Sequence, residues 1–187
     1  PQLLLLQPLF EEMNRCRALV ARLCRDFAAR GHGCWLPDLP GCGESARALE
    51  SVGWSDWTGT IEAALALVAR ESGAPAVATV AIRGGALLDA PSPRRWRLSP
   101  VAGASLLTDL RRAGLLASGA YPLPPALAGP LGGAEPDGSA RVMRLDGDER
   151  PCDLRGTGPA LWRRPEPLDS PELAAAIAGD VDRWIAA

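Results

Sequence analysis

The sequence predicts an α/β fold: a mostly parallel sheet with helices on both faces. Two observations support this prediction. Short uncharged apolar segments alternate with amphipathic segments along the chain, and the clearest apolar segments, residues 3–6 and 76–82, are continuous runs, as in strands buried on both faces. Such alternation is typical of βαβ units. The length of 187 residues suits a single domain, residues 1–187.

The first half of the chain predicts three strands and two helices. Residues 3–6 are a strand that ends at a proline, and the apolar positions between 19 and 27 recur on one helical face that Gly31 terminates. A short strand at 34–36 precedes a long loop at 37–45. Ser55 is the expected N-cap of a helix that reaches residue 72. Residues 76–82 are uncharged and rich in β-branched side chains, which favours a strand.

The second half is less regular. We expect a short helix at 86–89 cut off by two prolines, a strand at 96–99, a helix at 105–118, a strand at 140–145 and an irregular segment at 146–169. The density of Pro and Gly predicts a loop or reduced cap without regular structure at about 119–138. Ser170 and Pro171 begin a final helix with an apolar face.

Composition excludes several classes of function. The net charge of −2 gives no basic field for nucleic acid, and all basic residues are arginine, so lysine Schiff-base chemistry is absent. The five cysteines form no C-x-x-C pair, which favours reduced thiols and a cytoplasmic location. Residues 3–6 are too short for membrane insertion. No metal-ligand spacing is present, and we expect no metal and no cofactor.

One glycine-rich segment formally matches a dinucleotide-binding fingerprint. Gly41, Gly43 and Ala46 fit G-x-G-x-x-A, but prolines precede them and no helix follows at once. We therefore interpret residues 37–45 as a structural turn.

Residues 81–85 (AIRGG) follow the clearest strand directly. A sharp turn of the form G-x-S-x-G at this place carries the nucleophilic serine of α/β-hydrolases, and Arg83 occupies the serine position. A guanidinium is always protonated and donates hydrogen bonds only, so it cannot attack a carbonyl carbon. The turn is retained while the nucleophile is absent.

Two interpretations of Arg83 remain open. At a strand-to-helix turn a cation beside free amides suits an anionic ligand. Alternatively, Arg83 pairs internally with Glu11, Glu12 or Asp146, which we favour. The residues after the first strand lie where such hydrolases place an oxyanion-hole amide, although they also fit an ordinary loop. The candidate ligand-binding residues are Arg83, Gly84, Leu9, Phe10 and Glu11.

The rest of a Ser-His-Asp triad is incomplete. Asp146 and Asp148 follow a strand where the orienting acid would lie, and are candidate remnants, although acidic residues beside glycine also simply form turns. Residues 158–165, where the histidine would lie, contain none. His32 is expected in a surface loop away from the site. Without a base, no serine or cysteine is activated by the usual route.

Three segments resemble one family: residues 8–14 (PLFEEMN), 36–45 (LPDLPGCGES) and 83–88 (RGGALL). They are similar to the α/β-hydrolase-like family called hydrolase 2, exosortase A system-associated, from bacterial exopolysaccharide loci. The resemblance continues weakly to the last helix. Arginine commonly replaces the elbow serine in that family, whereas Ala81 departs from its first elbow glycine. The resemblance implies an α/β-hydrolase-like fold, a hydrolase label, a cytoplasmic location and a role near polysaccharide production or protein sorting.

Two functions follow as hypotheses. The first is a binding or accessory pseudoenzyme whose partner is a small anionic ligand or a protein of the exopolysaccharide system. The second is an active hydrolase or acyl transferase on an ester or acyl substrate that uses atypical residues, such as Cys42 as nucleophile or Asp38 and Glu44 as acid and base.

Overall fold

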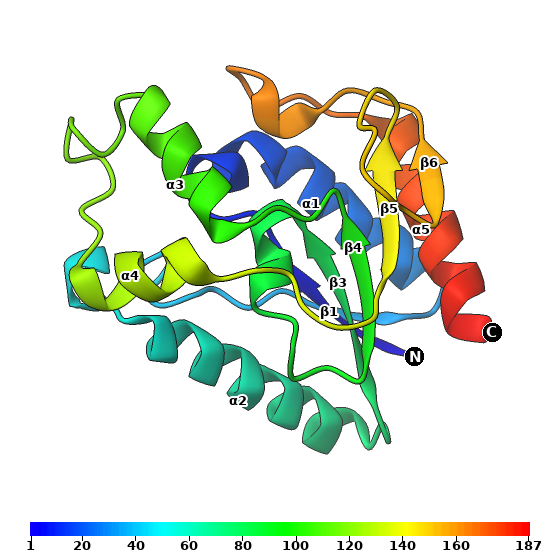
Figure 1. The fold of residues 1–187 in the computed structure, drawn as a ribbon. Helices are drawn as coiled ribbons and strands as arrows, with labels where there is room; N and C mark the ends of the chain where they lie inside the picture. The colour runs from blue at the N-terminus through cyan, green and yellow to red at the C-terminus, as the bar shows by residue number, and fades with distance from the viewer.

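The computed structural model describes all 187 residues, and its centre is a six-stranded sheet in which every neighbouring pair of strands is parallel. The spatial order is β2-β1-β3-β4-β5-β6 (Figure 1). The strands are β1 (Gln2–Leu6), β2 (Gly33–Trp35), β3 (Val77–Ile82), β4 (Arg94–Leu98), β5 (Arg141–Leu145) and β6 (Leu154–Gly156). All carboxyl ends of the strands therefore lie at the same end of the sheet.

Helices cover both faces of the sheet, as the sequence predicts (Figure 1). One face is covered by α1 (Glu11–Ala29) and α5 (Pro171–Ala186), and the other by α2 (Trp54–Ser72), α3 (Gly103–Arg112) and α4 (Pro125–Gly133).

The packing of β1 explains why residues 3–6 are all apolar. Leu3 and Leu5 pack in the cluster with α1 and α5, while Leu4 and Leu6 pack in the opposite cluster. Side chains alternate between faces along a strand, so a strand covered on both sides needs an apolar residue at every position.

All five predicted strands are present, with ends shifted by at most two residues. The sixth strand was missed, because residues 146–169 were expected to be irregular. Strand β6 pairs with β5, Met143 opposite Leu154, and a one-turn 3₁₀ helix, η3 (Leu161–Arg163), follows it. Three residues at a sheet edge are too short to show a period.

The expectation that residues 119–138 lack regular structure is wrong, because α4 lies within them. Pro125 takes the first turn, where its missing N–H and fixed φ suit a helix. Leu127 and Leu131, one turn apart, are fully buried. Their burial outweighs the cost of Pro130 inside the helix.

Other helix ends differ in detail. The N-cap of α2 is Gly53 rather than Ser55, because the Asp56 carboxylate reaches back to accept the Gly53 N–H at 2.7 Å. Helix α3 ends at Arg112, with left-handed Gly114 following.

The expected helix at 86–89 is a single 3₁₀ turn, η2 (Arg83–Leu87), directly after β3. Ser170 precedes α5 as predicted, but its side chain makes no capping bond. No helix is both long enough and apolar enough to cross a membrane.

Candidate functional site

The carboxyl end of the sheet concentrates backbone strain. Phe10, Arg83 and Ser99 follow β1, β3 and β4, which are adjacent strands, and they are the only non-glycine residues with positive φ, at 57°, 55° and 44°. Each such conformation costs about 1–3 kcal/mol and persists only where the surrounding structure holds it. Strain of this kind gathers at functional sites, so this end of the sheet is the first place to look for one.

The turn after β3 has the close packing of a nucleophile elbow. A Cβ on Gly85 would meet the Leu6 carbonyl oxygen at the end of β1, and a Cβ on Gly84 would lie 2.6 Å from Leu106 Cδ1. At position 85 only glycine fits without a shift of the neighbouring backbone, whereas a side chain at position 84 would require the Leu106 side chain to move. The elbow predicted from residues 81–85 is therefore present, with Arg83 at its tip.

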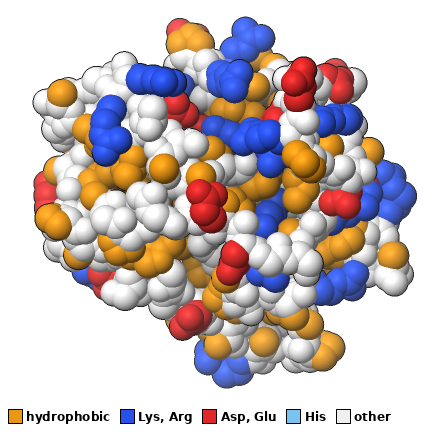
Figure 2. All heavy atoms as spheres, in the orientation of Figure 1, with side chains coloured by type: hydrophobic (Ala, Val, Ile, Leu, Met, Phe, Trp, Pro, Cys, Tyr) orange, Lys and Arg blue, Asp and Glu red, His pale blue; other side chains and the backbone are white.

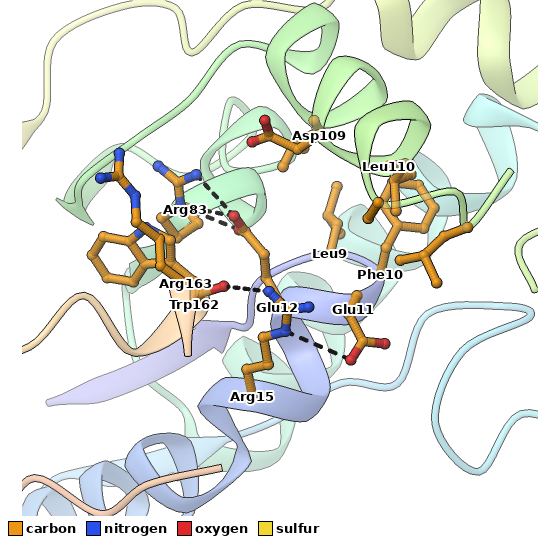
Figure 3. Close-up of a pocket in the computed structure, with 13 residues that line it drawn as sticks. Leu9, Phe10, Glu11, Glu12, Arg15, Arg83, Asp109, Leu110, Trp162 and Arg163 are labelled. Carbon is orange, nitrogen blue, oxygen red and sulfur yellow. Dashed lines mark hydrogen bonds and ion pairs between the residues drawn. The ribbon is translucent and has the colours of Figure 1, made fainter. Parts of the chain in front are cut away.

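Arg83 is 6 % exposed and forms an internal ion pair. Its Nη2 donates to Glu12 Oε1 at 2.8 Å, and its Nε lies 3.2 Å from both Glu12 oxygens (Figure 3). Its Nη1 donates to the Ser99 carbonyl oxygen at 3.3 Å. Its Cζ lies 4.9 Å from the centroid of the Trp162 ring. Of the two interpretations of Arg83, the favoured internal pair is present, with Glu12 as the partner.

Glu12 lies in the first turn of α1, and its side chain is largely buried, with 13 % exposed. Burial raises the pKa of its carboxyl group above the ordinary value, and the neighbouring Arg83 guanidinium opposes that rise. A smaller upward contribution comes from Asp109. The carboxylate therefore depends on Arg83 for its charge.

The triad positions hold other groups. Trp162, within the segment where a histidine would lie, is buried and stacks on Arg83. Asp148 accepts hydrogen bonds from Arg150 at 2.7 Å and Arg144 at 3.1 Å. These two guanidinium groups hold the pKa of Asp148 below its ordinary range, Arg150 contributing most. Asp146 is exposed and makes no side-chain hydrogen bond.

His32 lies away from these residues, as expected, but it is not a surface residue. It is 7 % exposed and its Nε2 lies 2.9 Å from Asp182 Oδ1 on α5. It precedes β2, so it lies at the amino end of the sheet. No imidazole is available to activate a nucleophile near Arg83.

Cys42, the atypical nucleophile of the alternative hypothesis, is held as a protonated thiol at neutral pH. Cys42 lies in the loop after β2, and burial raises the pKa of its thiol to about 11. Its neighbours in the Pro37–Ser45 loop form a turn in which Gly41 and Gly43 both have positive φ. All five cysteines are free thiols. No cluster of His, Cys, Asp and Glu is arranged to hold a metal ion.

A cavity of about 380 Å³ opens beside Arg83 between α1, α3 and η3 (Figure 3). Leu9, in the loop after β1, and leucines of α3 form one side. Charged side chains form the other, and they balance: Arg15, Arg83 and Arg163 face Glu11, Glu12 and Asp109.

Predicted residues Leu9, Phe10, Glu11 and Arg83 meet in this cavity, while Gly84 is buried beside Leu9 and Leu106. Asp146 and Asp148 instead line an adjacent cavity with Arg83. Trp162, Ser99 and Asp109 had no sequence signal as site residues. For Trp162 the expected position of the missing histidine could have drawn attention to it.

Tyr121, in the segment between α3 and α4, packs against Phe10 and Glu11. Its ring meets Phe10 edge-on at 5.5 Å, and its hydroxyl donates to Glu11 Oε2 at 3.2 Å. Burial raises the pKa of this phenol, and the neighbouring Glu11 carboxylate adds to the rise. The segment expected as a reduced cap thus contributes a contact to the site.

Comparison with solved structures defines the fold class. A structure described as that of LipS and LipT, two metagenome-derived lipolytic enzymes, matches with a TM-score of 0.56 and 15% sequence identity over 99% of this chain and 92% of that one. Tomato methylketone synthase I matches with 10% identity over 99% of this chain and 94% of that one, but its TM-score of 0.49 is too low to weigh. No protein-family model and no curated protein matches the sequence.

With its all-parallel sheet, its covering helices and its elbow after β3, the chain has the α/β-hydrolase-like fold that the sequence predicts. At 15% identity the likeness shows the fold alone.

Proposed function

We propose that this protein is an α/β-hydrolase-like binding or accessory protein that does not carry out Ser-His-Asp hydrolysis. The observation that supports this most strongly is Arg83 at the tip of the elbow, paired with Glu12 and stacked on Trp162. Nucleophilic catalysis needs a side chain with a free electron pair and a base that takes up its proton. A guanidinium and an indole only donate hydrogen bonds, so Arg83 and Trp162 can fill neither role.

The cavity beside Arg83 is the proposed ligand site. Its volume of about 380 Å³ falls in the range of small-molecule pockets, and it combines an apolar side with a few charged groups. The prediction of an anionic ligand relied on a free Arg83 cation. Glu12 neutralises Arg83, which leaves Arg163 as the unpaired cation of the cavity.

We further propose that the protein acts in the cytoplasm beside an exopolysaccharide system, as the resemblance to the exosortase A-associated hydrolase family implies. This role predicts that a strain that lacks the protein secretes less polysaccharide. Unchanged secretion would argue against it.

Labelling with a fluorophosphonate tests the absence of an activated nucleophile. Intact-mass spectrometry should detect no adduct on the wild-type protein, because no serine near Arg83 has a base beside it. An unrelated serine hydrolase treated in parallel serves as the positive control. A stoichiometric adduct on a serine of the native protein would refute the proposal.

A further inference from the structure

A second cavity of about 650 Å³ adjoins the first. The two share Arg83, Asp109, Trp162 and Arg163 as lining residues. Figure 3 shows the four side chains beside one another above α1. A ligand can therefore occupy both cavities at once across this shared boundary.

The two cavities differ in chemistry. The first has an apolar wall that includes Leu9, Leu106 and Leu110. The second is lined by Ser99 after β4, by Ser105 on α3 and by a run of acidic residues after β5 that begins at Asp146. A molecule that fits both has an apolar part and a polar part.

Two buried polar atoms of the second cavity lack a partner. Ser99 Oγ and Trp162 Nε1 are shielded from water and make no hydrogen bond within the protein. A buried hydrogen-bond donor without an acceptor destabilises a protein unless a bound molecule supplies the acceptor. Because the indole N–H only donates, its missing partner is an acceptor. A ligand reaches these atoms after a change of side-chain rotamer, a common adjustment on binding.

The charges and the unsatisfied indole N–H of the second cavity together favour a neutral head group over an ionic one. Asp148 is paired with Arg144 and Arg150. The unpaired carboxylates are Asp109, Asp146 and Glu149, against Arg163 as the one unpaired guanidinium of this cavity. Figure 2 likewise shows acidic and basic side chains interleaved along the upper rim of this face. The excess of carboxylates repels an anion; it attracts an ammonium group, but such a group offers no acceptor to the unsatisfied Trp162 N–H, which a hydroxyl supplies.

We propose that the two cavities together bind a neutral amphiphile, with an alkyl or acyl chain in the first and a head group that bears several hydroxyls, such as a sugar, in the second. Hydroxyl groups both accept from Ser99 and Trp162 and donate to the unpaired carboxylates. This inference deepens the proposed function and rests on it, because no group in either cavity attacks the bound molecule.

Calorimetry with octyl glucoside, below its critical micelle concentration, tests the proposal directly. Octyl glucoside should bind the wild-type protein at least tenfold more tightly than octanoate or octyltrimethylammonium. Methyl glucoside, which lacks the chain, should show no binding at millimolar concentration. Glycerol monooctanoate in place of octyl glucoside distinguishes a glycerol head from a sugar head.

Variants separate a ligand contact from a structural role. Trp162→Phe keeps an aromatic ring against Arg83 but removes the N–H together with part of the indole, so octyl glucoside affinity should fall about tenfold, or about 1.4 kcal/mol, and the smaller buried ring also lowers the melting temperature of the free protein. Ser99→Ala should weaken affinity in the same way. Trp184→Phe, on α5 and outside both cavities, is the matched control and should leave affinity unchanged.

Two results would overturn the inference: octanoate binding as tightly as octyl glucoside, which would indicate an anion site instead, or unchanged affinity in both Trp162→Phe and Ser99→Ala. Neither result bears on the fluorophosphonate experiment. Failure of this inference is therefore distinguishable from failure of the proposed function.

Discussion

Two buried arginine pairs in this protein differ in what surrounds them. Arg97 on β4 donates to both oxygens of Asp89 at 2.7 Å, and also to the Asp137 carbonyl oxygen at 2.6 Å. Asp89 is completely buried. Arg83 holds Glu12 through longer contacts of 2.8–3.2 Å and lines two cavities.

This difference in surroundings indicates that Arg97–Asp89 is a structural pair and that Arg83–Glu12 belongs to a candidate site. The Arg97 guanidinium contacts both oxygens of Asp89, and both side chains are almost fully buried, whereas the Arg83 pair lies beside strained backbone and unsatisfied polar atoms. In both pairs, burial raises the carboxyl pKa and the arginine opposes the rise. The surroundings of the Arg83 pair, and not the ion pair itself, therefore distinguish the candidate site from the structural pair.

The largest expected effect is on stability, from removal of the two arginines. Arg97→Leu should lower the free energy of unfolding by about 3–5 kcal/mol, because it leaves Asp89 buried without a partner. Arg83→Leu should cost only about 1–2 kcal/mol, because water in the adjoining cavities can solvate Glu12. Urea denaturation of the two variants beside the wild type measures both values. Equal losses would remove the distinction between the pairs.

The next effect concerns the reactivity of two thiols, Cys24 on α1 and Cys42 in the loop after β2. A hydrogen bond from Cys34 lowers the pKa of Cys24 below its ordinary value, whereas burial raises the pKa of Cys42 to about 11. At pH 7.5 iodoacetamide should modify Cys24 at least about tenfold faster than Cys42, because the thiolate is the reactive form. Cys42 modification should accelerate only as the pH rises toward 11.

Peptide mapping by mass spectrometry measures the rates at each cysteine. Cys16, whose pKa burial raises to about 12, is the matched slow control. Modification of Cys42 before Cys24 at neutral pH would contradict the assignment and revive Cys42 as a candidate nucleophile.

The smallest effect concerns Asp148, the candidate remnant of the triad acid. Its folded-state pKa lies below the unfolded value, so its carboxylate contributes stability above about pH 4, and that contribution is lost as the pH falls through the folded pKa. Asp148→Asn should cost about 1 kcal/mol at pH 7, because the contacts with Arg144 and Arg150 are partly exposed.

Thermal unfolding at pH 7 and pH 3 compares this variant with the wild type. The difference in stability between them should shrink at the lower pH. Asp146→Asn, whose carboxylate makes no contact, serves as the control and should change little at either pH. A difference for Asp148→Asn that is the same at both pH values would contradict the assigned pairing.

Much of the fold could be predicted from the sequence, and the limits have physical causes. The central strands were clear because burial on both faces requires continuous apolar runs, as in β1 and β3. Helix α4 was missed because the packing of Leu127 and Leu131 overrides local Pro and Gly preferences. Strand β6 depends on its pairing with β5, which no local pattern reveals.

Some residues of the candidate site could likewise be predicted from the sequence, and others could not. The elbow and Arg83 follow from local sequence, because a sharp turn needs glycine directly after a strand. The choice of Glu12 over Glu11 as the partner depends on which face of α1 meets β3. Ser99 and Trp162 belong to the site through their contacts with Arg83, which is distant from both in the sequence. No local sequence pattern around either residue predicts these contacts.

The central claim is that residue 83 holds a structural cation where related folds hold a nucleophile. The most direct test is ester hydrolysis across a panel of acyl chain lengths, measured for the wild type and for Arg83→Ala. Both proteins should show rates equal to the uncatalysed background. Turnover by the wild type that Arg83→Ala abolishes would contradict the claim.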